Sequence, residues 1–182
     1  MDHRTVLLEP WREEWQEEFR LEMQGIIGIT LADADELGYL DIRHVGSTSV
    51  KGMIAKPIID ILMCPEDNVP IEKFVPYLEW FKYKNLGECG RPGRLFLVSD
   101  EENQTTFHIH LCHRDHQVAR DQLLFKYLLE SNEDIFHDYF ELKCFLADVF
   151  SEDRDAYREM KGHFINSVLS AYRQKPEPGE FC

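Results

Sequence analysis

The sequence carries little positive charge for its length. Its 182 residues include 20 Lys and Arg against 34 Asp and Glu, a formal net charge of −14, and the isoelectric point is near 4.9. A chain with this charge repels a polyanion, so extended nucleic acid held through its phosphate backbone is excluded as a partner. A small nucleotide accompanied by a divalent cation stays compatible with the same charge.

Long apolar runs and paired cysteines are also missing. No run is long enough to span a bilayer, and Met1 to Arg4 form no apolar signal segment, so we expect a soluble cytoplasmic protein with no membrane partner. The cysteines are odd in number and include no C-x-x-C pair, which favours reduced thiols in the core over disulfides or a zinc knuckle. The five cysteines are Cys64, Cys89, Cys112, Cys144 and Cys182.

The sequence contains no internal repeat, no low-complexity segment and no linker that separates two domains. Its 43% of hydrophobic residues can fill one substantial core. We therefore expect a single domain over residues 1–175, with a sheet core at about 36–114 and closing helices at about 117–175. Residues 176–182 are expected to form a flexible tail.

Hydrophobic periodicity predicts the order of the elements. Apolar residues at helical spacing predict a first helix of about six turns from Pro10. In the segment 105–112 the alternation places His108 and His110 on one strand face and Ile109 on the other. The further expected elements are strands at 41–45, 58–63, 94–99 and 105–112, an acidic loop at 100–104, and helices at 71–81, from 117, at 135–150 and at 157–172.

A turn of small residues follows the first expected strand. Gly46, Ser47, Thr48 and Ser49 allow backbone N–H groups and hydroxyls to approach an anion closely, and we expect these four residues to contact a phosphate. The alternative is that the turn only caps a helix, which uses the same N–H geometry. Lys56, fixed between an alanine and a proline, is the lysine expected to assist in binding.

Asp60 is the only charged residue in the apolar strand at 58–63. A carboxylate inside an apolar run is costly unless it is paired, hydrogen-bonded or bound to a metal ion. We therefore expect Asp60 to lie at the edge of an active or binding site.

The stretch HVGSTSVKGMIAKPIIDI, which begins at His44, resembles the GrpB-like family of the nucleotidyltransferase superfamily. The resemblance implies an α+β fold, in which a nucleotidyltransferase-type mixed β-sheet with helices on one face is followed by a C-terminal helical bundle. Further segments are similar to the family and extend the resemblance over nearly the whole chain: residues 6–15, the His-x-His strand at 107–111, and residues 139–165.

The resemblance also implies a chemistry. Nucleotidyl transfer in this superfamily uses two carboxylates one residue apart on a strand, plus a third nearby, to hold divalent ions. Here Asp60 is present, but its expected companion is Leu62. The implied function is binding of a nucleotide or phosphometabolite, with transfer of a nucleotidyl or phosphoryl group by means of a divalent metal ion. The alternative is a non-catalytic nucleotide- or phosphate-binding module that has lost the second carboxylate.

A single metal ion held by Asp60, His108 and His110 is one way to replace the lost carboxylate. These three residues are the candidate catalytic residues and metal ligands, if the His-x-His strand lies beside the Asp60 strand. Two imidazoles and one carboxylate favour zinc or manganese over magnesium. The alternative is that the histidines only occupy the polar face of a half-buried strand. His44 is a possible further ligand, or a residue that bonds neighbouring backbone.

Basic residues gather near the turn and the hairpin, against the acidic trend of the chain. Lys51 and Lys56 flank the turn, while Arg91 and Arg94 precede the hairpin. In the closing helices, the resemblance implies residues that reach over the cleft towards phosphate, although Tyr157 and Lys161 at i, i+4 also fit an ordinary surface pair. These family-matching residues are Lys143, Arg154, Tyr157 and Lys161.

Overall fold

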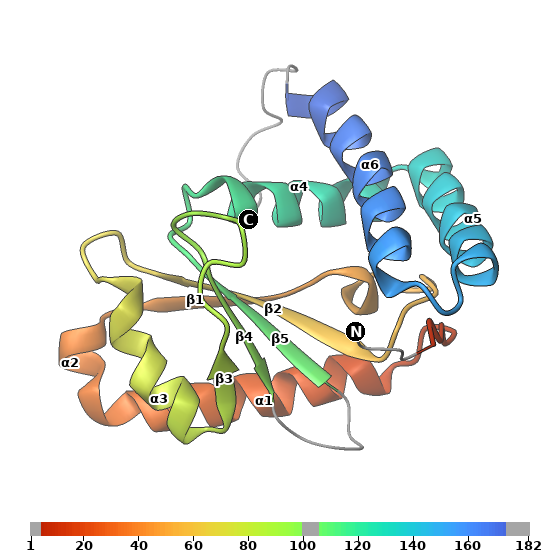
Figure 1. The fold of residues 1–182 in the computed structure, drawn as a ribbon. Helices are drawn as coiled ribbons and strands as arrows, with labels where there is room; N and C mark the ends of the chain where they lie inside the picture. The colour runs from red at the N-terminus through yellow and green to blue at the C-terminus, as the bar shows by residue number, and fades with distance from the viewer. Residues whose placement is uncertain (1–4, 100–105, 174–182) are drawn as a thin grey trace.

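The computed structural model describes residues 5–99 and 106–173. Within them, five strands form one sheet, and helices precede, interrupt and follow it (Figure 1). The acidic loop expected at 100–104 and the tail expected at 176–182 lie outside the described residues. The elements are α1 (Glu14–Thr30), α2 (Ala34–Leu37), β1 (Leu40–Val45), β2 (Ile58–Pro65), α3 (Val75–Trp80), β3 (Tyr83–Asn85), β4 (Leu95–Ser99), β5 (Thr106–Leu111), α4 (Gln117–Ser131), α5 (Glu133–Val149) and α6 (Arg154–Arg173), with 3₁₀ turns at Leu31–Asp33, Ser47–Ser49 and Ile71–Phe74.

The sheet is mixed, with the strand order β1-β2-β5-β4-β3. β2 and β5 run parallel, and the other neighbouring strands are antiparallel. The register of the parallel pair places Asp60 opposite His108 and Leu62 opposite His110. The expected neighbourhood of the Asp60 strand and the His-x-His strand is therefore confirmed.

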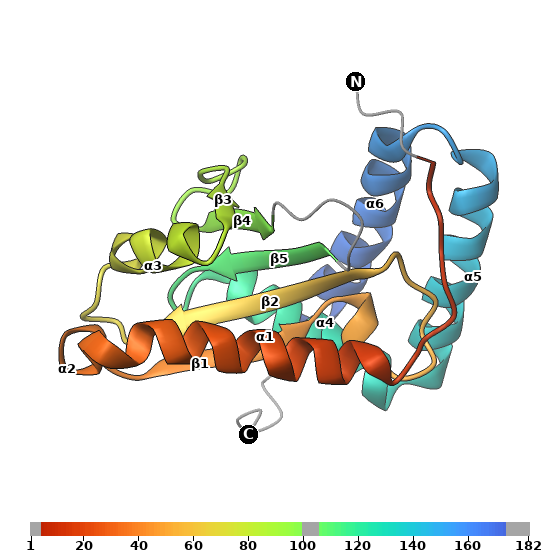
Figure 2. The ribbon, with the colours of Figure 1, turned by 90° about the horizontal axis from the view of Figure 1, so that it is seen from below.

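One face of the sheet packs against α1, α2 and α3 (Figures 1 and 2). Ile59 and Ile61 of β2 and Ile109 of β5 have no exposed surface and pack in one cluster with Trp15 and Leu78. Burial of such side chains contributes about 1.5–3 kcal/mol each. This core fixes the strands and therefore fixes which side chains project from the opposite face.

On the opposite face of the sheet, one part packs against α4 and the other part carries polar side chains. At one end, Leu62 and Cys64 of β2 pack with Cys112 and against Val118 of α4. At the other end, the same face carries Asp60 and the two histidines of β5, because alternate residues of a strand share a face. The start of α4 therefore covers half of this face and leaves the other half for a site.

The closing helices are attached to the segment between β1 and β2. Met53 of that segment packs with Leu129 of α4 and Tyr139 of α5, and Lys143 of α5 donates a hydrogen bond to the carbonyl of Ile54. Figures 1 and 2 show α5 and α6 beside the end of the sheet at which β2 begins. The α+β fold class, with a mixed sheet followed by closing helices, is confirmed.

One local prediction was wrong, and one strand was not predicted. The first helix begins at Glu14 rather than Pro10 and has 17 residues, because Glu9 pairs with Ala55 in an isolated bridge and the residue before a proline favours extended geometry. The strand Tyr83–Asn85 was not predicted, since three residues show no readable periodicity.

The described cysteines are free thiols. Cys64 and Cys112 are buried in the core as expected, whereas Cys89 and Cys144 are exposed, so the prediction of core packing was wrong for these two. Among the described helices, none combines the length and the hydropathy that crossing a membrane requires.

Candidate functional site

The turn after β1 passes directly beneath Asp60. Gly46 has φ +71° and ψ −174°, a backbone conformation that is essentially confined to glycine. A Cβ atom at this position would overlap Oδ2 of Asp60 and lie 3.0 Å from the Asp60 Cβ and Cγ atoms. Gly46 is therefore needed for the close approach of the turn to the carboxylate.

Three polar side chains near this turn face inward. The hydroxyl of Thr48 donates to the carbonyl of Ile58 (3.0 Å) and lies 3.0 Å from Nε2 of His44, while the hydroxyl of Ser49 donates to the carbonyl of Gly46 (2.7 Å). His44, Thr48 and Ser49 are all buried. Their side chains hold the turn together in this structure, and the contacts of Thr48 and Ser49 with a phosphate and of His44 with a metal ion stay predictions.

Ser47 is the member of the turn whose side chain hydrogen-bonds outside the turn, with Tyr139. It lines both cavities described below, together with Asp60. Its neighbour across the smaller cavity is Tyr139, whose pKa is raised well above its ordinary value because burial outweighs a hydrogen bond with Ser47. Tyr139 therefore stays protonated, and Ser47 links the turn to the closing helices.

Asp60 lies among imidazole and guanidinium groups. Its Oδ1 atom is 3.4 Å from Nε2 of His110 and 3.6 Å from Nδ1 of His108. Burial alone would raise the pKa of Asp60, but hydrogen bonds from the two histidines outweigh burial and hold it far below its ordinary value. Asp60 is therefore ionised at neutral pH. A carboxylate with so low a pKa is a weak base.

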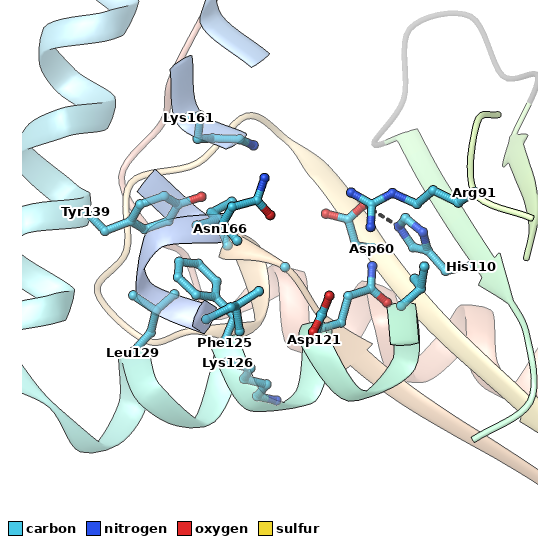
Figure 3. A pocket seen from close by; sticks show the side chains of 16 residues that line it. Asp60, Arg91, His110, Asp121, Phe125, Lys126, Leu129, Tyr139, Lys161 and Asn166 are labelled. Carbon is cyan, nitrogen blue, oxygen red and sulfur yellow. Dashed lines mark hydrogen bonds and ion pairs between the residues drawn. The ribbon is translucent and has the colours of Figure 1, made fainter. Parts of the chain in front are cut away.

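Arg94 determines which ring nitrogen of neutral His110 carries the hydrogen. Nη1 of Arg94 lies 3.1 Å from Nδ1 of His110, and a guanidinium can only donate, so Nδ1 is the accepting nitrogen. Burial lowers the pKa of His110, and the neutral ring then carries its hydrogen on Nε2, which points to Asp60 (Figure 3). The described arrangement is a chain of hydrogen bonds from Arg94 through His110 to Asp60.

These residues do not fit a metal centre as they are arranged. A metal-bound histidine normally donates its second ring N–H to a carboxylate or carbonyl, whereas the second nitrogen of His110 accepts from Arg94. Residues 5–99 and 106–173 contain no group of three or more His, Cys, Asp or Glu side chains placed to hold a metal ion. The structure brings Asp60, His108 and His110 together, but the metal ion expected there stays a prediction.

Leu62 stands at the position where the resemblance implied a second carboxylate. Its side chain is 1% exposed and packs against Val118 and Ala119 at the start of α4. A carboxylate at this position would be buried among apolar groups, at a high cost in solvation. The Leu62 side chain therefore contributes to the packing of α4 on the sheet.

A cleft of about 1400 Å³ opens above Asp60, between the sheet and α6. Seven Lys and Arg side chains and four Asp and Glu side chains line it, whereas the whole sequence has 20 basic against 34 acidic residues. The basic lining residues are Lys56, Arg91, Arg94, Lys143, Arg154, Arg158 and Lys161, and the acidic ones are Asp60, Glu152, Asp153 and Asp155.

Lys56 sits among these cations. Its Nζ atom lies 4.6 Å from the centre of the Tyr157 ring, and Nζ of Lys161 lies 5.8 Å from the same ring. Burial, followed by repulsion from Arg154, Lys161 and Arg158, lowers the pKa of Lys56 from 10.5 to about 8. Burial also lowers the pKa of Lys143. An anion in the cleft would relieve both the repulsion and the loss of solvation.

The predicted basic residues lie in different surroundings in the structure. Lys56, Arg91 and Arg94 line the cleft. Tyr157 is buried, with the ammonium groups of Lys56 and Lys161 over its ring, rather than part of a surface pair. Lys51 is exposed and lines neither cavity. Sequence analysis missed Arg158, although its spacing from Arg154 and Lys161 on one helix face was a signal that could have found it.

A smaller pocket of about 270 Å³ adjoins the cleft, and the two share Ser47, Asp60, Arg91, His110 and Lys161. Its outer wall comes from the three closing helices. Figure 3 shows Phe125, Leu129 and Tyr139 on one side of this pocket and Asp60, Arg91 and His110 on the other. Phe125 and Tyr139 were not predicted as site residues, because aromatic side chains on amphipathic helices are typical of core packing.

Known proteins are similar in sequence to most of this chain. A UPF0157 protein of Pseudomonas aeruginosa is 33% identical over 158 residues, which cover 85% of this chain and 62% of that protein. The glutamate-rich protein GrpB of Alkalihalophilus pseudofirmus is 30% identical over 172 residues, which cover 91% of this chain and 94% of that protein. The chain thus spans less than two thirds of the Pseudomonas protein.

A solved structure and a family model agree with these relatives. The crystal structure of the conserved protein GrpB from Enterococcus faecalis superimposes with a TM-score of 0.74 at 30% identity, over 92% of this chain and 100% of that chain. The family model described as GrpB protein matches residues 5–171. Since this match includes the turn, Asp60, the His-x-His strand and the lysines of the closing helices, the chain belongs to the GrpB family.

Proposed function

We propose that this protein binds a small phosphorylated ligand, a nucleotide by class, in the cleft between the Asp60 face of the sheet and α6. One observation carries the proposal: basic side chains outnumber acidic ones seven to four in this cleft, although the chain has a net charge of −14. A reversal of charge sign confined to one concave surface attracts anions of matching size. The acidic remainder of the surface disfavours a polynucleotide.

The half-buried lysines supply the strongest reason to place phosphate there. Lys56 and Lys161 both lie over the ring of Tyr157, and within the described residues neither forms an ion pair with a carboxylate. Cations removed from water attract an anion more strongly than exposed ones do. Ser47, at the mouth shared by both cavities, adds a hydroxyl donor for a phosphate oxygen.

Transfer of a nucleotidyl or phosphoryl group is the second candidate function. The observation that favours it is the approach of His108 and His110 to Asp60, within 3.6 Å of one carboxylate oxygen. A bound divalent ion would supply charge neutralisation for such a reaction. The present geometry supports binding more directly, because Asp60 is a weak base and the nitrogen of His110 nearest to it carries a hydrogen.

Substitution of the two lysines tests the proposed ligand site. Pyrophosphate should raise the melting temperature of the wild-type protein, since a ligand that binds only the folded state stabilises it. Lys56→Met and Lys161→Met should each weaken pyrophosphate binding by about fivefold, as expected for a lost charge-assisted contact. Thermal shift measured over a series of pyrophosphate concentrations gives the affinities.

Lys51→Met is the matched control, because Lys51 is exposed beside the same turn and lines neither cavity. It should leave the affinity unchanged. The proposal fails if all three variants respond to pyrophosphate as the wild type does, or if the wild type does not respond at millimolar concentration.

The pKa of Lys56 predicts how anion binding depends on pH. Since this pKa is about 8 in the free protein, Lys56 is mostly protonated at pH 7 and mostly neutral at pH 9. Binding of an anion favours the protonated form, so affinity for sulfate, which does not titrate in this range, should fall about fivefold from pH 7 to pH 9. Sulfate titrations of Lys56→Met should show a smaller decrease, and an equal decrease in both proteins would contradict the assignment.

A further inference from the structure

Lys56 extends into the basic cleft from a fixed stretch of backbone. Ala55, the residue before it, is buried and exchanges two hydrogen bonds with Glu9 (2.7 and 2.9 Å). On the other side, the carbonyl of Lys56 accepts from the amide of Ile58 (2.7 Å), and the ring of Pro57 restricts the chain between these two groups. The amine of Lys56 is therefore held at a defined place in the wall of the cleft.

The surroundings of Lys56 disfavour the charged form of its amine. Its half-buried side chain has the Tyr157 ring on one side, and the charges of Arg154, Lys161 and Arg158 oppose its own. With a pKa of about 8, about one Lys56 amine in ten is neutral at pH 7, against about one in three thousand at the ordinary pKa of 10.5. Partial removal from water and neighbouring cations are the conditions under which a lysine acts as a nucleophile.

The other two lysines of the cleft differ from Lys56. Lys143 is 2% exposed, and its ammonium group donates to the carbonyl of Ile54, so a ligand reaches this nitrogen only by breaking that bond. Lys161 lies farther from the ring of Tyr157, at 5.8 Å, and contributes to the repulsion at Lys56. Nothing in residues 5–99 and 106–173 accepts a hydrogen bond from the amine of Lys56, which leaves this amine open to a ligand.

A phosphate group would hold a small ligand beside this amine. The charges that surround Lys56 come from α6, where Arg158 also pairs with Asp155 (2.9 Å). Such side chains bind phosphate oxygens through charge-assisted hydrogen bonds. The cleft of about 1400 Å³ has room for the rest of a small phosphorylated molecule. A reactive group on that molecule would then meet Lys56 within one complex rather than by an encounter in solution.

We propose that Lys56 is a nucleophile that forms an imine with a small phosphorylated aldehyde held in the basic cleft. The lone pair of Nζ attacks the carbonyl carbon, and a proton passes from the nitrogen to the carbonyl oxygen. The carbinolamine then loses water and leaves a C=N bond, so the step needs no oxidant or reductant. The inference rests on the phosphate site of the proposed function and adds a second class of ligand to that site.

Pyridoxal 5′-phosphate is a suitable probe, because it carries an aldehyde and a phosphate on one small molecule. Wild-type protein is mixed with an equimolar amount at neutral pH and low salt, and sodium borohydride then reduces the imine to a stable amine. Mass spectrometry should show a single pyridoxyl group, and peptide mapping should place it on Lys56. Excess pyrophosphate should prevent this labelling, and pyridoxal, which lacks the phosphate, should need an about tenfold higher concentration.

Two arginine substitutions accompany the mapping. Lys56→Arg keeps the positive charge but removes the amine, so labelling should fall about tenfold or more, and circular dichroism shows whether the variant is folded. Lys51→Arg is the matched control at an exposed lysine beside the same turn, and it should be labelled as the wild type is. The mapping itself uses wild-type protein, so its result stands even if Lys56→Arg does not fold.

Binding of pyrophosphate separates the two possible failures. Labelling of Lys161 or Lys51 in preference to Lys56, or equal labelling by pyridoxal and its phosphate, would overturn the imine. Either result leaves the proposed function standing if the wild-type protein still binds pyrophosphate. Failure of pyrophosphate to bind would overturn the proposed function and, with it, the phosphate contact on which this inference rests.

Discussion

Gly46→Ala is expected to lower the free energy of unfolding by about 2–5 kcal/mol and to abolish anion binding. The backbone at Gly46 has φ +71°, where an L-residue is strained. The added methyl group would also overlap Oδ2 of Asp60. Either the turn or the carboxylate must move, and Ser47 moves with the turn. Chemical denaturation gives the change in stability, and pyrophosphate titration gives the change in binding.

Gly28→Ala is the matched control for this substitution. Gly28 lies within α1, and nothing lies within 4 Å of a Cβ atom placed there. Alanine in a helix interior is favoured over glycine by about 0.5–1 kcal/mol, so this variant should be at least as stable as the wild type and should bind normally. A Gly46→Ala protein with wild-type stability and affinity would show that the turn does not need its glycine.

Asp60→Asn is expected to tighten sulfate binding in metal-free buffer by about tenfold or more, because it removes the negative charge at the centre of the cleft. Asparagine keeps the shape of the side chain and an oxygen that can accept from Nε2 of His110. The basic side chains then act on the anion without an opposing carboxylate. Calorimetric titration with sulfate after treatment with a chelator measures the effect.

The metal-dependent alternative predicts the opposite sign for the same variant. If a divalent ion joined Asp60 to the phosphate, zinc, manganese or magnesium would strengthen wild-type binding, and Asp60→Asn would lose that gain. Weaker sulfate binding by Asp60→Asn, together with a metal-dependent gain in the wild type, would restore the metal site predicted at Asp60, His108 and His110.

The part of the site within the sheet could be predicted from the sequence. The apolar run around Asp60 and the alternation around His108 and His110 identify two buried strands and the faces of their side chains. Strand periodicity is a local property of the sequence, so it can be recognised without knowledge of the fold. The expectation that these two strands are neighbours came instead from the family resemblance, since periodicity does not determine which strands pair. Their parallel direction is a finding of the structure.

The roles of individual hydroxyl and basic groups could not be predicted in the same way. Thr48 and Ser49 have the residue types of a phosphate turn, but their hydroxyl hydrogens bond to carbonyls of the turn and of Ile58. Whether a hydroxyl faces inward depends on which carbonyl lies nearby, and that is a property of tertiary structure. For Lys56 the neighbouring residues did carry a signal: its position between an alanine and a proline distinguished it from Lys51, and Lys56 lines the cleft whereas Lys51 does not.

The smaller pocket could not be predicted from the sequence, for a further reason. Phe125, Tyr139 and Gln122 are ordinary residues of amphipathic helices, and nothing in their spacing distinguishes a pocket wall from a core. The pocket exists because α4, α5 and α6 leave a space beside Asp60.

Calorimetric titration of the wild-type protein with pyrophosphate, in metal-free buffer at neutral pH and low salt, tests the central claim most directly. The charge of the cleft predicts saturable binding at a single site, with an affinity that falls as salt screens the basic side chains. The absence of binding heat at millimolar pyrophosphate, or binding that Lys56→Met and Lys161→Met together leave unchanged, would contradict the claim that this cleft is a phosphate site.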